Sequence, residues 1–437
     1  MARLAELLTP KTLFVFFLCG FAAMLPLSVS IAEIMLAGAL LTKSLQIAQE
    51  DKSGEFGLKI FRQPLFWPWM AYLVAALISC LLSINPQRSL SYLNSDFLKA
   101  SACLFLIASM PYGKSREYIL NSYLTGAAAA AAWALGKFAH GLYRLGPNEF
   151  IIAGASRTTS TVNPITYGTV LSFAFFLTAA LILNSKKEEQ KAWRYALLLT
   201  TGLALLLNQS YGVYLGCAAV LVLMALFAKA NRLKLLVPLL ILALLVAPAA
   251  LLKKSNRFSL LLPQVSIFVK KSAGLEVPTT ESAKTSASIS MRLDLWKTGL
   301  QILKDYPLTG VGPANVRQSF DYYHPQPFII EHKKVFGFGN LHNLYLHQAA
   351  ERGLLGLGAL LYLFVALLRY AWNLRKRTDS PYTLWAFCML PGFYLMNISE
   401  TSFQHALPSL SMCLMLGLAA SAAEEERPPS ENPPAKL

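Results

Sequence analysis

Charged residues are scarce in this 437-residue sequence, at 14% of the total, whereas hydrophobic residues make up 55%. That is more apolar side chain than one water-soluble core needs to bury, so lipid is the expected solvent for much of the chain. The six cysteines all lie in apolar stretches and form no CxxC pair, so neither a disulfide framework nor a cysteine metal site is predicted. We also expect no cofactor and no nucleic-acid partner.

The apolar residues come in uninterrupted blocks of helix length. A block of roughly 20 residues spans the hydrocarbon core of a bilayer. We predict twelve such helices, near residues 12–28, 29–46, 65–84, 94–110, 117–140, 164–184, 193–208, 211–228, 233–252, 354–373, 382–398 and 406–422. The expected fold class is all-α: a polytopic membrane protein of about twelve transmembrane helices with a large helical loop between the ninth and the tenth.

Lysine and arginine gather in alternate loops between these helices. Clusters occur at 43–62, 114–116, 186–194, 229–234 and 375–377, and the short loops between them hold few. Because positive residues favour the cytoplasmic side of a membrane, both termini are predicted to be cytoplasmic.

This orientation divides the chain into four parts. Residues 1–252 would hold helices 1–9, residues 253–352 a loop on the side opposite the cytoplasm, and residues 353–422 helices 10–12. Residues 423–437 have too few apolar side chains to bury and are predicted to be a disordered cytoplasmic tail.

The large loop is basic, with twelve Lys and Arg residues against six Asp and Glu residues between positions 253 and 340. Such a surface would concentrate anionic ligands or contact anionic lipid headgroups, and charge alone leaves both interpretations open. Spacings of three and four residues place one apolar stripe on a helix: Ile289, Leu293, Trp296, Leu300 and Leu303. We expect this helix to lie on the membrane surface or against the bundle, and to end before Pro307.

Three residues outside the membrane could carry chemistry. A neutral histidine such as His342, at the start of a helical run, can take a proton from a sugar hydroxyl. Arg292 and Arg157 could each bind diphosphate oxygens through two parallel hydrogen bonds. Structural histidines at helix ends and solvated arginines are common, so these positions alone do not assign a function. His342 and His347 are five residues apart, which does not put both on one helix face, and no metal site is predicted there.

The motifs of the large loop resemble the O-antigen ligase and polymerase family of bacterial envelope enzymes. An Arg and a Trp at 291–296 are followed by a Pro-x-x-Gly-x-Gly turn at 305–315, a His-Asn pair at 342–345 and Glu-Arg-Gly-Leu-Leu-Gly at 351–356. The segment 157–164, from Arg to Asn-Pro, is similar to the family's upstream element.

The resemblance implies a metal-independent, inverting glycosyltransferase with a GT-C-like helical fold, in the bacterial inner membrane with a periplasmic active site. It would move a glycan from an undecaprenyl-diphosphate carrier to an acceptor hydroxyl. By position in the motifs, His342 would activate the acceptor, Arg292 would hold the diphosphate, and Arg157 would be a second phosphate contact. The adjacent Asn343 and Tyr345 would be further substrate contacts.

One element departs from the family pattern. Where members often carry Ser-Arg-Gly, this chain has Ser210-Tyr211-Gly212, so an expected cation is absent. Arg88 and Arg257 are candidates to supply that charge, and Tyr211 would lie beside the substrate.

Several functions remain open. We favour an O-antigen ligase, with the lipid A core oligosaccharide as acceptor and membrane lipids around the protein, because about twelve helices and a late large loop are typical of ligases. A polymerase that joins repeat units on the carrier is the nearest alternative. A small-anion transporter should carry ionisable residues near the membrane midplane and paired helix breaks, and neither is apparent in the sequence. A non-catalytic envelope scaffold is a further interpretation.

Overall fold

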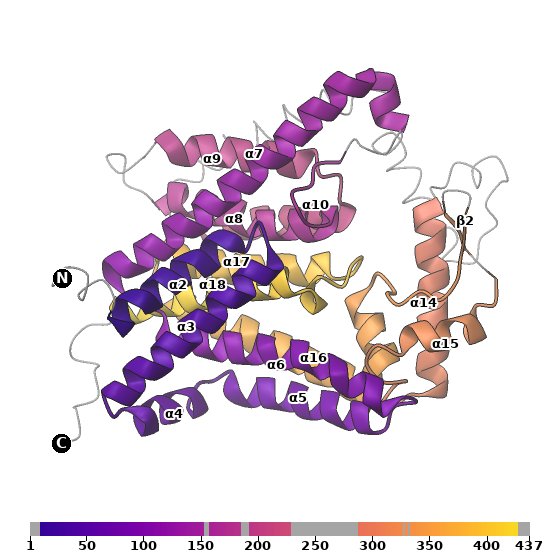
Figure 1. The fold of residues 1–437 in the computed structure, drawn as a ribbon, viewed down its shortest axis with the longest axis horizontal. Helices are drawn as coiled ribbons and strands as arrows, with labels where there is room; N and C mark the ends of the chain where they lie inside the picture. The colour runs from indigo at the N-terminus through magenta and orange to yellow at the C-terminus, as the bar shows by residue number, and fades with distance from the viewer. Residues whose placement is uncertain are drawn as a thin grey trace.

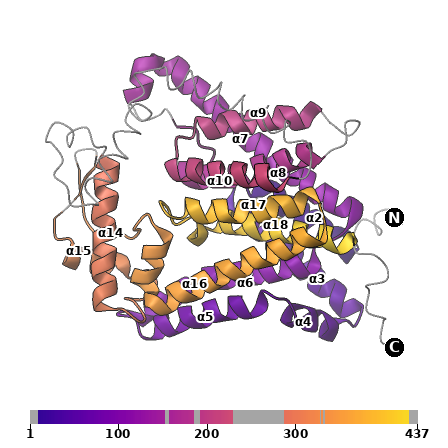
Figure 2. The ribbon, with the colours of Figure 1, turned by 180° about the vertical axis from the view of Figure 1, so that it is seen from behind.

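The computed structural model describes residues 9–152, 157–184, 192–228, 287–326, 328–330 and 333–426. Most of them form one bundle of long helices (Figures 1 and 2). The bundle helices are α2 (Pro10–Met24), α3 (Val29–Gln49), α5 (Phe66–Leu81), α6 (Pro86–Ser109), α7 (Gly113–Ile152), α8 (Pro164–Asn184), α9 (Ala192–Leu206), α10 (Tyr211–Phe227), α16 (Leu344–Arg377), α17 (Pro381–Met396) and α18 (Ala406–Glu425). Eleven of the twelve predicted helices are thereby confirmed as helices, and 233–252 lies outside the described residues.

Two helices form the centre of the bundle. All residues of α18 from Leu407 to Ala423 are buried, and so are those of α8 from Thr166 to Leu183. Helix α18 packs against α6, α17 and α8. A helix that is hydrophobic on every side is stable only inside a core or a membrane, so these two helices are surrounded by the others.

The two ends of the bundle differ. Helix α2 begins and α18 ends at one end, the terminal end, while α14 (Ala287–Asp305) and α15 (Val316–Tyr323) lie across the other, the loop end (Figure 1). Basic residues of the predicted inside loops meet at the terminal end: Arg116 pairs with Glu425 (2.7 Å), and Lys59 Nζ donates to Ala108 O (2.8 Å).

The helices identify a membrane protein, although fewer than twelve meet a strict test of length and hydropathy. Four are long and apolar enough to cross a bilayer, namely α3, α8, α16 and α18. Helix α4 (Ser53–Phe61) and α5, bent by 76°, pass the test as a pair, in the manner of a broken span or a re-entrant loop. Helices α2, α9 and α10 are apolar but shorter. A 16-residue helix such as α5 is only about 24 Å long, shorter than the hydrocarbon core of about 30 Å.

The prediction of an all-helical chain is wrong in one place. Strands β1 (Phe328–Ile330) and β2 (Lys333–Val335) pair antiparallel in the large loop, with Phe328 opposite Val335. Aromatic and β-branched residues favour strands, and here they occur in runs too short for a transmembrane helix. Helices α4 and α15 are also additions to the predicted set.

The loop helix α14 exists as predicted and ends at Asp305. Trp296 of the predicted stripe packs against the buried cluster of the loop, but the most buried residues of the helix lie outside the stripe. Leu295 and Ile302 are fully buried, whereas Leu300 of the predicted stripe is 53% exposed. A Cβ on Gly299 would lie 2.6 Å from Leu341 Cδ1, so this glycine permits a close approach on the buried face. The helix packs against α16 and hence against the bundle.

The expectation that the helices carry no charges near their middle is also wrong. Asp96 and Lys99, both of α6, are 2% exposed and pair at 3.1 Å. Arg352 of α16 reaches Asp96 (2.6 Å) and donates to the Tyr72 hydroxyl (2.7 Å). The sequence did not reveal this cluster because Arg352 lies more than 250 positions after Asp96 and Lys99.

The Pro-x-x-Gly-x-Gly turn fixes the large loop to a break in α16. At Gly353 the φ angle is +63°, which interrupts the helix and leaves backbone groups on both sides without helical partners. The turn satisfies them: Val311 N donates to Ala350 O (3.0 Å), Gly312 N to Glu351 O (2.7 Å), Leu354 N to Pro307 O (2.8 Å) and Leu355 N to Leu308 O (3.1 Å). Buried backbone groups must be paired in a membrane protein, so this turn and this break require each other.

Candidate active site

One carboxylate joins two of the predicted site residues at the loop end. Glu400 lies between α17 and α18, and its Oε2 is 3.0 Å from His342 Nδ1. Its Oε1 accepts a hydrogen bond from Arg292 Nη2 at 2.7 Å. Three segments far apart in the sequence therefore meet at this side chain.

The backbone around His342 is fixed by the same α17–α18 connection. Leu344 N donates to Asn397 O (2.9 Å) and to Glu400 O (3.0 Å). Asn340 accepts from His342 N (2.8 Å) and donates to Thr401 Oγ1 (2.8 Å).

His342 itself has a φ of +48°, in the left-handed region that non-glycine residues rarely adopt. Such strain persists only where the surroundings determine the conformation, and it is concentrated at functional sites.

This arrangement orients the imidazole so that one of its ring nitrogens faces Glu400. A carboxylate only accepts hydrogen bonds, so Nδ1 carries the proton of neutral His342 and Nε2 keeps its lone pair. The side chains of His342 and Arg292 are 24% and 21% exposed, while that of Glu400 is only 10% exposed. The histidine and the arginine are therefore accessible to a ligand, and the more buried carboxylate contacts both of them.

Asn343 and Tyr345 have structural contacts. Asn343 caps α16, because its side chain accepts from Leu346 N at 3.0 Å. The Tyr345 hydroxyl donates to Tyr394 O on α17 at 2.8 Å. Both residues hold the start of α16, and hence His342, in place.

Arg157 lies at the turn between α9 and α10, next to Tyr211. Its Nε donates to Asn208 O (3.0 Å) and its Nη2 to Ser210 Oγ (2.7 Å). The guanidinium beside the position of the absent family arginine is therefore that of Arg157. The turn also borders the active-site segment, since a side chain at Gly212 would clash with Ser399, the neighbour of Glu400.

Among the residues that the structure describes, no contact joins Arg88, another candidate cation, to Glu400. Arg88 lies in the first turn of α6, where Asn85 caps the helix by accepting from Arg88 N (3.2 Å). The adjacent Ser89 donates to Pro313 O (3.0 Å), which places Arg88 at the loop end. Arg257 lies outside the described residues.

His347 faces a different carboxylate from His342. Its Nε2 is 3.4 Å from Glu351 Oε1, and Glu351 Oε2 accepts from Gln404 Nε2 (3.3 Å). Among the residues that the structure describes, no group of three or more His, Cys, Asp or Glu side chains could hold a metal ion.

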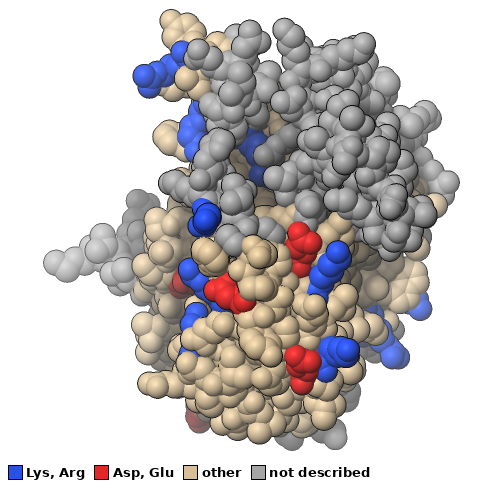
Figure 3. Space-filling model, turned by 90° about the vertical axis from the view of Figure 1, so that its right-hand side faces the viewer, with Lys and Arg blue, Asp and Glu red and all other residues tan. Residues whose placement is uncertain are grey.

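Charges of both signs are interspersed on the loop end. Figure 3 faces this end, and on its described part Lys, Arg, Asp and Glu side chains lie scattered among other residues. Six of the twelve basic residues counted in the loop lie between 253 and 284, outside the described ranges.

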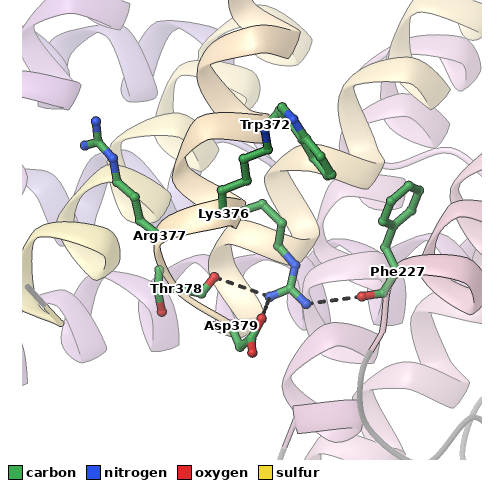
Figure 4. Close-up of a pocket in the computed structure, with 7 residues that line it drawn as sticks. Phe227, Trp372, Lys376, Arg377, Thr378 and Asp379 are labelled. Atoms are coloured by element: carbon green, nitrogen blue, oxygen red, sulfur yellow. Dashed lines mark hydrogen bonds and ion pairs between the residues drawn. The ribbon is translucent and has the colours of Figure 1, made fainter.

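A cavity of about 360 Å³ lies at the opposite end of α16 (Figure 4). It is lined by Phe227, Trp372 and residues 375–379. Arg375 donates to Phe227 O (3.1 Å) and pairs with Asp379 (3.2 Å). Since His342 precedes the first residue of this 34-residue helix, the cavity is separate from the candidate site.

Glu400 is the functional candidate that the sequence motifs did not identify. It lies after the last recognised motif, in a short connection between two apolar helices. The sequence offers one indication of its role: Glu400 is an isolated acidic residue in a connection predicted to lie on the same side of the membrane as the large loop.

Comparison with known proteins agrees with the motifs. Residues 196–361 match the family model described as O-antigen ligase, a range that includes Arg292 and His342 but not Arg157 or Glu400. No curated protein matches the chain. This region of the chain is therefore similar to the O-antigen ligase and polymerase family.

Proposed function

We propose that the protein is an O-antigen ligase, which transfers a glycan from undecaprenyl diphosphate to a hydroxyl of the lipid A core oligosaccharide. The observation that carries this proposal is the pairing of His342 and Arg292 with the two oxygens of Glu400. It brings an imidazole and a guanidinium together at the end of the bundle that carries the large loop, which supports the proposed roles.

In the proposed reaction, His342 Nε2 takes the proton of the acceptor hydroxyl while the acceptor oxygen attacks the anomeric carbon of the donor sugar. The bond from that carbon to the diphosphate oxygen breaks, and the electron pair leaves with undecaprenyl diphosphate. Attack opposite the leaving group inverts the anomeric configuration. The proton on His342 then passes to solvent or to the departing diphosphate.

Arg292 would neutralise the charge that develops on the leaving group. A guanidinium has five N–H donors, and the Glu400 contact at 2.7 Å uses one of them. Cations that bind the departing diphosphate more strongly than the bound donor lower the barrier. Arg157, oriented by Asn208 and Ser210, is the proposed second phosphate contact, and Arg88 a third.

The proposal includes an orientation in the bacterial inner membrane. The loop end would face the periplasm, and both termini would lie in the cytoplasm, with about twelve spans in total. The positive-inside rule supports this orientation, as does the meeting of Lys59 and Arg116 at the terminal end. The carrier's lipid tail would lie between helices, with membrane lipids around it.

Complementation of a ligase-deficient bacterium tests the function. Wild type, His342→Ala and the control His140→Ala, an exposed histidine of α7, are expressed to equal levels, and lipopolysaccharide is separated on a gel. We expect long-chain ladders with wild type and His140→Ala, and core bands alone with His342→Ala.

Three other outcomes would contradict the proposal. Core bands with all three chains, together with a changed glycan length on the lipid carrier, would identify a polymerase. Ladders restored equally by His342→Ala would remove this histidine from catalysis. Core bands with all three chains and an unchanged carrier-linked glycan would favour a scaffold.

A further inference from the structure

A second cavity lies on the large loop, away from Glu400. Its volume is about 410 Å³, and it is lined by Asp305, Tyr306, Ser319, Tyr322 and Tyr323. These residues come from the C-terminal end of α14 and from α15.

The chemistry of this cavity combines aromatic rings with oxygen groups. Tyr322 is 82% exposed and stands edge-on to Tyr323, with ring centroids 5.0 Å apart. The Tyr323 hydroxyl donates to Asp305 Oδ2 at 2.7 Å, which fixes that ring beside the carboxylate. Ser319 adds a hydroxyl on the same side of α15. Tyrosine offers an apolar face with a polar edge, and a sugar ring offers the matching pair, a C–H face and a rim of hydroxyls.

The position of the cavity argues against a membrane-anchoring role for these tyrosines. Tyrosine is enriched where helices cross the membrane surface. In both ribbon views, however, α15 extends beyond α14 on the side away from the bundle (Figures 1 and 2). A large exposed aromatic surface in water is typical of a binding site.

We propose that this cavity is a subsite for a glycan, and that it binds sugars remote from the reacting bond. The inference rests on the proposed function, which supplies glycan substrates at this end of the molecule. Asp305 follows Arg292 by thirteen residues on one helix, so the two are about 20 Å apart along its axis. A glycan must extend over several sugar rings to contact both.

Both substrates of the proposed reaction carry such a glycan. The shared chemistry is an oligosaccharide with accessible ring faces and hydroxyls, from the donor polymer or from the acceptor core. Both can be prepared free of lipid, which separates binding at this cavity from binding of the diphosphate.

The test is a titration of the purified full-length protein with each lipid-free glycan, followed by saturation-transfer NMR. Wild type is compared with Tyr322→Ala, with Tyr322→Phe, which keeps the ring, and with Tyr143→Ala. Tyr143 is a matched control, because it is 89% exposed on α7. Substitution of such exposed side chains should leave the fold intact.

We expect at least one of the two glycans to bind wild type, Tyr143→Ala and Tyr322→Phe with similar affinity, and Tyr322→Ala about tenfold more weakly. The glycan that shows this difference is the natural occupant. Equal affinity of Tyr322→Ala and wild type, or no binding of either glycan, would overturn the proposal. Ligation activity is measured separately, so a chain that binds glycan through Tyr322 but does not ligate would refute the proposed function alone.

Discussion

A single buried carboxylate determines the geometry of the candidate site at the scale of residues. A buried charge is costly unless it is paired and hydrogen-bonded, and Glu400 meets this condition through Arg292 and His342. The contact with Nδ1 also orients the imidazole, so the pairing of the carboxylate and the position of the His342 ring have one origin.

Replacement of Glu400 by Gln should therefore reduce turnover without weakening donor binding. The amide can hold the imidazole in the wrong tautomer, and general-base catalysis contributes about 10²–10⁴-fold. We expect kcat to fall about 100-fold or more while the KM for the lipid-linked donor does not rise, since Arg292 is released to bind phosphate. Steady-state kinetics of the purified protein measure both quantities. Glu400→Asp, which keeps the charge, should recover part of the loss, and a rise in donor KM as the main effect would contradict this role.

Arg292→Lys should have the complementary effect. Lysine keeps the charge but loses the planar fork that binds two phosphate oxygens. We expect kcat/KM for the donor to fall about 100-fold, with a raised donor KM. Arg317→Lys on α15, an exposed position of the same loop, is the control and should retain wild-type kinetics. Equal kinetics of Arg292→Lys and wild type would exclude bidentate phosphate binding.

His342 and Arg292 could be predicted from the sequence because each lies in a motif with recognisable neighbours. Glu400 could not, since it has no motif and becomes informative only when the chain returns to the loop end 58 residues after His342. The contact of Tyr345 also depends on a tertiary partner, Tyr394, that a motif does not contain, whereas the Asn343 cap is local.

At the scale of elements, the decisive feature is the set of backbone hydrogen bonds between the Pro-x-x-Gly-x-Gly turn and the break in α16 at Gly353. Gly310 and Gly353 both have positive φ angles, and each faces the backbone of the opposing segment. A resemblance gives the order of these glycines, but their purpose follows from the backbone groups that the break in α16 leaves unpaired.

Gly310→Ala should destabilise the protein by about 2–4 kcal/mol, because the new Cβ would clash with the backbone of Ala350 and Glu351 at a strained φ of +65°. Thermal unfolding in detergent measures the loss. Gly358→Ala is the matched control: no atom lies within 4 Å of its added Cβ, and alanine favours a helix, so stability should stay equal or rise by up to about 1 kcal/mol. An unchanged midpoint for Gly310→Ala would show that the turn is not required for docking.

Helix α14 illustrates how an element can be predicted correctly and oriented wrongly. Its sequence carries two apolar rows, one through Leu293 and Leu300 and another through Leu295 and Ile302. The packed row is the one that includes Gly299, where Leu341 can approach closely. Periodicity fixes the helix, but the choice of face depends on the partner.

Long apolar blocks made the bundle predictable at the scale of the whole molecule, because a membrane-embedded helix must satisfy its own backbone hydrogen bonds. The buried charges were not predictable in the same way. Asp96 and Lys99 fall in a predicted helix, and their pairing with Arg352 requires that α6 and the start of α16 be adjacent.

The charge cluster holds one carboxylate between two cations, and the contribution of this carboxylate to stability can be tested. Asp96 faces the two cations Lys99 and Arg352, so Asp96→Asn leaves both without that carboxylate in a site only 2% exposed. Removal of one partner from a buried pair costs about 3–5 kcal/mol. We expect a large fall in the thermal midpoint of the purified protein.

Glu50→Gln is the control for this prediction, because Glu50 pairs with Lys52 at a surface where the two side chains are 44% and 58% exposed. An exposed pair contributes about 0–1 kcal/mol, so the control should unfold close to wild type. If Asp96→Asn also unfolded at a temperature close to that of wild type, water would have to reach the cluster. A polar path would then run from the loop end into the bundle. That result would support the transporter interpretation. A large loss of stability would instead show that the ion pairs of Asp96 with Lys99 and Arg352 fix the position of α16, the helix that follows His342.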